Sequence, residues 1–108
     1  MDFGEVKFTH VIVGAGSAGC LLANRLSAKV SNRVLLLEAG EWDRGFWLKL
    51  PVGYYKTMNN PEVSRHFSTE PSLGSGGRSI NWPRGRVIGG SSSINGLIFI
   101  RGQHKDFD

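Results

Sequence analysis

Three glycines and one glutamate have the residue types and the spacing that bind a nucleotide pyrophosphate. Gly14, Gly16 and Gly19 form the pattern Gly-x-Gly-x-x-Gly, and Glu38 lies 19 residues beyond the last of them. In this pattern the first glycine permits a tight turn, the second lets the backbone approach phosphates, and the third lets a helix pack closely on a sheet. A carboxylate about 20 residues further on can accept hydrogen bonds from ribose hydroxyls. The spacing therefore predicts a dinucleotide with an ADP half, and the charge of Glu38 disfavours a 2′-phosphate.

These residues require a strand, a turn, a helix and a second strand to position them. The segment 8–13 ends in a β-branched apolar run typical of a strand buried in a parallel sheet, and 33–37 reads as a second buried strand that ends at Glu38. Between them, 20–26 is helical, and three of its residues fall on one face that can cover the sheet: Leu22, Ala23 and Leu26. The start of that helix directs free N–H groups and a positive dipole end at the phosphates. The predicted fold class is α/β, with a Rossmann-like βαβ start of a parallel sheet.

A second glycine-rich stretch, residues 81–102, contains another candidate phosphate site. Gly89 and Gly90 free the backbone to approach a ligand, and Ser91, Ser92 and Ser93 can cap a following helix and donate to ligand oxygens. A single fingerprint cannot support the whole length of FAD, with its pyrophosphate, ribityl chain and flavin ring. Two such stretches in one short chain therefore favour a long ligand.

The region between the two motifs shows no clean periodicity. The aromatic-rich segment 41–57 predicts an irregular excursion with a short helix after Pro51, and we interpret it as packing. Residues 66–70 predict a short strand, followed by a loop or hairpin end at 72–78. Cys20 is interpreted as a small, buried structural residue of the first helix.

Length and charge set further limits. A chain of 108 residues corresponds to about one small domain. Its single cysteine gives no sign of an oxidising compartment, and no apolar run approaches the ~18 residues of a membrane span. Residues 1–5 do not resemble a signal peptide, so we expect a soluble, cytoplasmic protein. The net charge is +4, and residues 71–105 hold four arginines and no carboxylate, which leaves nucleic-acid binding open as an alternative.

At these motifs the sequence resembles the glucose–methanol–choline (GMC) oxidoreductases. The family's N-terminal pattern is matched by residues 13–26 and 36–40. Its first signature has the order Gly-basic-x-apolar-Gly-Gly-Ser-Ser-x-apolar-Asn and continues through an aromatic and a small residue to a polar residue, and residues 85–108 match it. Residues 69–71 and 82–85 are similar to the family as well. Arg65 departs from a tryptophan that many relatives carry close to this position.

The resemblance implies that the chain is the N-terminal portion of an FAD-binding domain. Residues 84–92 would run along the pyrophosphate and ribityl chain, and 95–98 would lie against the flavin ring, where N–H groups near Gly96 could stabilise charge on the reduced flavin. The implied cofactor-binding residues are Gly14, Gly16, Ser17, Ala18, Gly19, Glu38, Arg84, Val87, Gly89, Gly90, Ser91, Ser92, Asn95, Gly96, Leu97 and Ile98. Some members attach FAD covalently through a histidine at the position of Ile94, which has no nucleophilic atom, so non-covalent FAD is expected.

The resemblance further implies oxidation of a primary alcohol to an aldehyde, with hydride transfer to flavin N5. The family's catalytic histidine lies on a substrate domain outside these residues, and His10, His66 and His104 match none of its motifs. The expected partners are a small alcohol and the rest of the same enzyme, with no nucleic acid and no membrane span. The alternatives are a hydroxynitrile lyase of the same FAD fold, an NAD-dependent dehydrogenase, and a non-enzymatic nucleic-acid-binding module.

Overall fold

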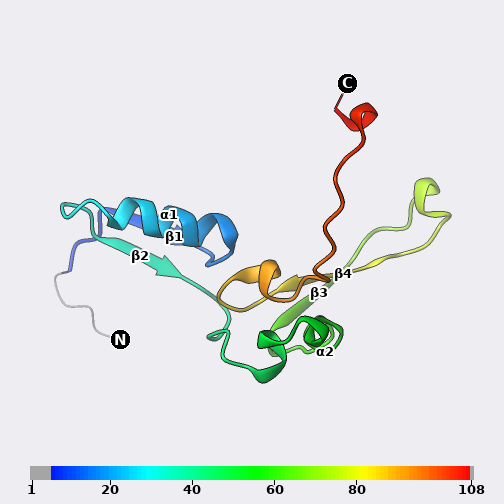
Figure 1. The fold of residues 1–108 in the computed structure, drawn as a ribbon, viewed down its shortest axis with the longest axis horizontal. Helices are drawn as coiled ribbons and strands as arrows, with labels where there is room; N and C mark the ends of the chain where they lie inside the picture. The colour runs from blue at the N-terminus through cyan, green and yellow to red at the C-terminus, as the bar shows by residue number, and fades with distance from the viewer. Residues whose placement is uncertain (1–5, 108) are drawn as a thin grey trace.

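The chain begins with the predicted strand–helix–strand unit. The computed structural model describes residues 6–107, so the sequence-based reading of residues 1–5 lies outside it. Strand β1 (His10–Val13) pairs in parallel with β2 (Val34–Leu37), with His10 opposite Val34 and Val13 opposite Leu37. Helix α1 (Ser17–Ser27) connects them and lies along the sheet, as Figure 1 shows. The α/β prediction is confirmed.

One face of α1 packs on the two strands. Gly19, Cys20, Ala23 and Leu26 are partly buried and recur at helical spacing, while Leu22 is 52% exposed. The prediction that Leu22 belongs to the covering stripe is wrong. Successive residues of a helix are rotated by about 100°, so Leu22 is turned away from the sheet once Ala23 faces it. Cys20 is half-buried rather than buried.

Three short helical turns follow β2. They are η1 (Phe46–Lys49), η2 (Pro51–Gly53) and α2 (Tyr54–Thr57), which confirm the short helix predicted after Pro51. Gly53 is buried because the backbone turns back on itself there, and a Cβ at this position would overlap the carbonyl oxygen of Trp47. The aromatic segment is therefore a compact coil of turns.

A β-hairpin carries the chain to the second glycine-rich motif. Strand β3 (Ser64–Ser68) pairs antiparallel with β4 (Asn81–Gly85), and the connecting loop contains η3 (Leu73–Ser75). The predicted strand at 66–70 exists but begins two residues earlier, and the predicted loop at 72–78 is the hairpin end. In Figure 1 this loop extends well away from the βαβ unit.

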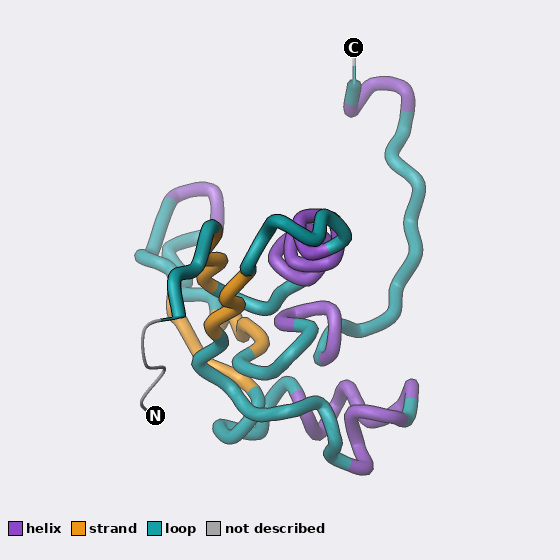
Figure 2. Tube along the Cα trace, turned by 90° about the vertical axis from the view of Figure 1, so that its left-hand side faces the viewer, coloured by secondary structure: helices purple, strands orange, loops and turns teal. Residues whose placement is uncertain are grey.

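The segment after β4 differs from the prediction. Instead of a helix capped by serines, it forms the single turn η4 (Gly90–Ser93), whose N-cap is Gly89 with no side-chain hydrogen bond. The serine hydroxyls bond locally instead: Ser92 donates to the carbonyl of Gly89, and Ser93 to that of Ile88. Beyond it the chain is extended to η5 (His104–Asp106) and projects from the rest of the molecule (Figure 2).

The described helices are short compared with a helix that spans a membrane. Among residues 6–107, α1 is the longest helix at 11 residues. A membrane crossing needs about 20 predominantly apolar residues in a helix. No helix in this part of the chain is long and apolar enough to cross a membrane.

The apolar core of the described residues is small. The buried hydrophobic residues are Ala15, Val87 and Ile94, whereas Val13 in the first strand is 83% exposed. Within residues 6–107, α1 covers one face of a two-stranded sheet and leaves side chains of β1 uncovered, so the burial of both strands inside a larger parallel sheet stays a prediction. The radius of gyration is 17.8 Å, against about 13 Å expected for a compact domain of this length.

The 108-residue chain should therefore not unfold cooperatively by itself. Its two-stranded sheet and few buried side chains cannot offset the conformational entropy of ordering the chain, which is about 1–2 kcal/mol per residue for the backbone. We expect a broad, shallow urea transition by circular dichroism. A single steep transition whose slope matches the surface that a 108-residue globular domain exposes would contradict this expectation.

Candidate cofactor-binding site

The first glycine loop forms a sharp turn that aims the start of α1 at the carboxyl end of the sheet. Gly14 has a φ of +96°, and its N–H donates to the carbonyl of Leu37 at 2.7 Å. Gly16 is the N-cap of α1 with no side-chain cap, and a Cβ built on it would meet no atom within 4 Å. The first N–H groups of a helix lack partners within the helix. The backbone of Ser17 and Ala18 thus forms an anion-binding end beside an open surface.

The third glycine of the motif permits close packing. A Cβ on Gly19 would overlap the carbonyl oxygen of Gly14 and lie 3.4 Å from the Cγ2 of Ile12 in β1. Gly19 therefore lets α1 press against both the loop and the sheet, as predicted. The thiol of Cys20 donates to the carbonyl of Ala15 at 3.2 Å, which agrees with a structural role for this cysteine.

Glu38 connects the end of β2 to the glycine loop. Its Oε2 accepts a hydrogen bond from the N–H of Ala15 at 2.7 Å, and its Oε1 accepts one from the N–H of Gly40 at 2.9 Å. Sequence reasoning missed this role, because nothing in the spacing shows that Ala15 lies beside Glu38. A carboxylate offers about four lone-pair sites, so these two bonds leave capacity for ribose hydroxyls.

A cavity opens beside Glu38 at the carboxyl ends of both parallel strands. It measures about 350 Å³ and is lined by Val13, Gly14, Leu37, Glu38 and Ala39. Ligands of open α/β sheets bind outside the carboxyl ends of the strands. The predicted ribose site therefore lies where the topology of the fold favours a ligand.

The structure brings the second glycine-rich motif onto the first. The N–H of Gly89 donates to the carbonyl of Ala15 at 2.7 Å, and Gly16 and Gly89 form a parallel bridge. In Figure 1 the η4 turn lies beside the start of α1. Val87 is fully buried just before this contact. The two candidate phosphate sites are thus parts of one site.

The protein packs so closely at Gly90 that a side chain would not fit there. Its φ is +61°, and a Cβ there would lie 2.9 Å from the Cα of Gly16. This contact adds to the reason given from the sequence, approach to a ligand, which stays a prediction: the atoms that the Cβ would meet belong to the first glycine loop. A substitution at Gly90 would separate the two loops whatever ligand they bind.

Two further glycines permit close approach of the backbone, and sequence reasoning missed both. A Cβ on Gly40 would overlap the carbonyl oxygen of Arg86, and one on Gly85 would overlap that of Gly90. In the sequence their only signal was a place in the family motifs. They let the second motif fold back over the end of β2.

Positive charge gathers next to Glu38. Arg65 lies opposite Arg84 in the hairpin, and both line a cavity of about 230 Å³ with Arg86 and Glu38. The guanidinium of Arg84 stacks over Trp82 at 4.5 Å from the ring centroid, and the Nε of Arg86 donates to the carbonyl of Ala39. Three cations and one carboxylate give this edge of the site an excess of positive charge, which suits a phosphate group.

The residues predicted to face the flavin form a strained turn. The N–H of Leu97 donates to the Oδ1 of Asn95 at 3.0 Å, and Leu97 has a φ of +56°. A bulky residue in this conformation is an outlier that typically marks a turn or a functional constraint. Of the N–H groups predicted near Gly96, that of Leu97 is engaged by Asn95. Ile98 is largely exposed.

Two cavities lie beside the turn at Asn95–Leu97. One of about 180 Å³ is lined by Arg84, Ser91, Ile94, Asn95 and Gly96, among others. Another of about 230 Å³ lies between the turns at 47–54 and the residues Ser92, Asn95 and Leu97. None of the described histidines lines either cavity. The predicted residues therefore form two connected groups, one around Glu38 and one around Asn95, joined by the Gly16–Gly89 contact.

Comparison with known proteins identifies the family. Residues 8–108 match the family model described as GMC oxidoreductase. The chain belongs to the GMC oxidoreductase family. The resemblance inferred from the motifs is confirmed over nearly the whole sequence.

Individual relatives are much longer than this chain. An oxygen-dependent choline dehydrogenase of Photobacterium profundum is 48% identical over 104 residues, which are 96% of this chain and 18% of the relative. An alcohol dehydrogenase [acceptor] of Pseudomonas putida is 48% identical and is covered over 18% of its length by 93% of this chain. The crystal structure of pyridoxine 4-oxidase from Mesorbium loti matches with a TM-score of 0.82 at 40% identity, over 94% of this chain and 20% of that one. The chain thus spans about a fifth of the relatives it matches.

The GMC family binds FAD, and the residues of this chain fit the ADP half of that cofactor. A side chain at Gly16 would fill the surface beside the helix start, the free helix end and the arginines suit a pyrophosphate, and Glu38 lies beside a cavity at the strand ends. The assignment of single residues to FAD stays a prediction.

Gly16→Ala tests the pyrophosphate assignment, because the structure accommodates the new methyl group. The backbone at Gly16 has an ordinary φ of −76°, so we expect a stability change of about 1 kcal/mol or less at this N-cap. Retention of FAD by the full-length protein should fall at least tenfold, measured as flavin per polypeptide after gel filtration.

Gly19→Ala is the contrasting variant. It should lower both stability and flavin content, since its Cβ overlaps Gly14. Normal flavin content in Gly16→Ala would remove Gly16 from the cofactor site.

Glu38→Ala should weaken FAD binding by about 1–3 kcal/mol, the scale of hydrogen bonds to a charged group. It should also loosen the glycine loop, because Ala15 and Gly40 lose their acceptor. Isothermal titration of the apoprotein with FAD measures the first effect, and thermal unfolding without FAD measures the second.

Glu41→Ala, which removes an exposed carboxylate three residues away, is the matched control and should change neither quantity. Equal FAD affinity in Glu38→Ala and the wild type would refute the ribose assignment.

Proposed function

We propose that this chain is the FAD-holding N-terminal portion of an enzyme that oxidises a primary alcohol to an aldehyde. The observation that carries the proposal is the backbone pairing of the two glycine-rich loops, Gly89 to Ala15, at the start of α1. A single glycine loop would serve NAD or FAD equally well. Two joined loops, one leading to Glu38 and the other to Asn95, make a continuous surface suited to a ligand as long as FAD.

The residues around the first loop are proposed to bind the ADP half. The backbone of Gly14, Gly16 and Gly19, with the N–H groups of Ser17 and Ala18, would hold the pyrophosphate. Glu38 would accept from the ribose hydroxyls while it keeps its bonds to the loop. Arg84 is stacked on Trp82, and its charge would balance the phosphates.

The second motif is proposed to hold the remaining part of the cofactor. Its contributing residues would be Val87, Gly89, Gly90, Ser91 and Ser92 along the ribityl side, and Asn95, Gly96, Leu97 and Ile98 at the ring. Ser91 already accepts a hydrogen bond from the N–H of Gly85 through its Oγ, which fixes the turn against β4. The hydrogen bond from Leu97 to Asn95 supports the strained turn, and a turn ordered in this way would reduce the entropy cost of binding.

Bound FAD supplies the hydride acceptor for the oxidation. The residues of this chain position and shield that acceptor, and we assign none of them the role of general base. The histidines described here lie in β1, β3 and η5, and none of them lines the cavities at Asn95. The base and the substrate domain are proposed to lie outside these 108 residues. The relatives named choline dehydrogenase and alcohol dehydrogenase support an alcohol as substrate.

The attachment of FAD is proposed to be non-covalent. Ile94, at the position of the linking histidine in some members, is 5% exposed and carries no nucleophilic atom. Its N–H donates to the carbonyl of Ser91, which makes it the C-cap of the η4 turn. A hydrocarbon side chain packed in this way cannot form a bond to the flavin.

The full-length protein that contains this chain tests the proposal. We expect it to purify yellow, and we expect its visible flavin absorption to bleach when a primary alcohol such as ethanol, 1-butanol, benzyl alcohol or choline is added without oxygen. Acid precipitation should leave a colourless pellet and all the flavin in the supernatant. Colour retained by the pellet would refute non-covalent binding.

The same samples separate the alternative functions. A colourless protein that binds NAD would favour a nicotinamide-dependent dehydrogenase. A yellow protein that no alcohol bleaches but that cleaves a hydroxynitrile would favour the lyase. Binding to DNA with a steep dependence on salt would favour the nucleic-acid module.

A further inference from the structure

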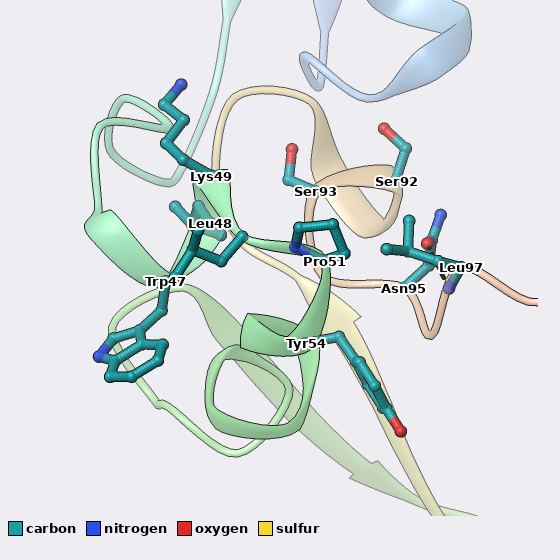
Figure 3. Close-up of a pocket in the computed structure, with 10 residues that line it drawn as sticks. Trp47, Leu48, Lys49, Pro51, Tyr54, Ser92, Ser93, Asn95 and Leu97 are labelled. Carbon is teal, nitrogen blue, oxygen red and sulfur yellow. Dashed lines mark hydrogen bonds between the residues drawn. The ribbon is translucent and has the colours of Figure 1, made fainter.

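The aromatic turns at 46–57 form one wall of the cavity at the second motif. Figure 3 shows this cavity, of about 230 Å³, between Leu48, Pro51 and Tyr54 on one side and Ser92, Ser93 and Asn95 on the other. The sequence led us to interpret these turns as packing. Several of their residues instead line the same cavity as Asn95 and Leu97, which are proposed to lie against the flavin ring.

The ring of Tyr54 lies beside the backbone of Gly96. A Cβ built on Gly96 would lie 3.8 Å from Cε2 and 3.9 Å from Cδ2 of the Tyr54 ring. The ring therefore lies over the backbone of Gly96. Any side chain at position 96 would stand directly beside this ring. Gly96 has no side chain, and the ring of Tyr54, which comes from another segment, takes up space beside its backbone.

Two buried residues hold the turn that carries Tyr54, while Tyr54 itself is 37% exposed. Gly53 is buried under the carbonyl of Trp47, and Thr57 is 4% exposed. The carbonyl of Tyr54 accepts from the N–H of Met58 at 2.9 Å. Tyr55, the next residue, is 71% exposed and touches Tyr54 edge to face at 6.4 Å between ring centroids. Of these two adjacent tyrosines, Tyr54 is the less exposed, at 37%, and only Tyr54 lines the cavity.

Two other features of the cavity bear on what it can hold. Leu97, which also lines it, is the residue with the left-handed backbone, and such strain concentrates at ligand sites. The charged lining residue is Lys49, which pairs with Asp43 at 3.2 Å, and no carboxylate belongs to the lining formed by the described residues. The wall is therefore mainly apolar, with a few hydroxyl and amide groups.

We propose that Tyr54 determines substrate specificity by limiting the width of the alcohol that can lie beside Asn95–Leu97. This inference rests on the proposed alcohol oxidation. The uncharged carbon skeleton of the alcohol contacts the ring of Tyr54, and the hydroxyl of Tyr54 is not required. An alcohol with a bulky aromatic group competes with that ring for space, whereas a short aliphatic alcohol does not.

The experiment compares three variants of the full-length, FAD-loaded protein. Tyr54→Ala removes the ring, Tyr54→Phe keeps it without the hydroxyl, and Tyr55→Ala removes the neighbouring ring that does not line the cavity. For each protein, kcat/KM is measured for ethanol and for benzyl alcohol, together with flavin content and the visible circular dichroism of the bound flavin.

In Tyr54→Ala we expect the ratio of kcat/KM for benzyl alcohol to that for ethanol to rise about tenfold or more, as hydrophobic pockets discriminate by roughly 10–200-fold per group. The visible dichroism of the flavin should change as well. Tyr54→Phe should keep the wild-type ratio, and so should Tyr55→Ala.

An unchanged ratio in Tyr54→Ala with normal flavin content would overturn the inference and leave the proposed function standing. An equal shift in Tyr55→Ala would overturn it too, because a general loosening of the turns would then be the cause. A wild-type protein whose flavin is reduced by no alcohol would overturn the proposed function, and the inference with it.

Discussion

The backbone contact between the two glycine-rich loops is the constraint on which the rest of the site depends. The Gly89 N–H donates to the carbonyl of Ala15, and Gly90 approaches Gly16 so closely that neither loop has room for an added Cβ at Gly90. The bond belongs to an isolated parallel bridge between the first glycine loop and the segment that follows β4. It places the η4 turn at the start of α1, so both proposed halves of the cofactor site share one piece of backbone.

Glu38 holds this arrangement from the other side. Its carboxylate accepts from Ala15 and from Gly40, while the carbonyl of Ala15 accepts from Gly89. One peptide unit of the glycine loop is therefore fixed by β2 and by the second motif together. The carboxylate also lies beside the arginines of the hairpin. The site thus combines the negative carboxylate of Glu38, which shapes the glycine loop, with a positively charged edge that suits phosphates.

The turns at 46–57 show how a segment with no periodic pattern contributes to a site. Gly53 allows the chain to fold back on Trp47, and this brings Tyr54 over Gly96. The turn at Asn95–Leu97 keeps a left-handed leucine by giving its N–H an acceptor. A strained backbone of this kind costs about 1–3 kcal/mol, and the small core around Val87 and Ile94 supplies little to offset it.

The features that the sequence determined by itself are local ones. The glycine spacing, the apolar runs and the carboxylate after the second run predicted the βαβ start and the place of Glu38, and the motif around Gly89 indicated the family, because turns, helices and parallel strands depend on residues close together in the chain. The tertiary structure decided what those elements touch: the pairing of Gly89 with Ala15, the hydrogen bonds of Glu38, the exposure of Leu22 and Val13, and the position of Tyr54 over Gly96. These contacts join segments far apart in the chain, and their geometry follows from packing and backbone pairing, which no local pattern of residue types records.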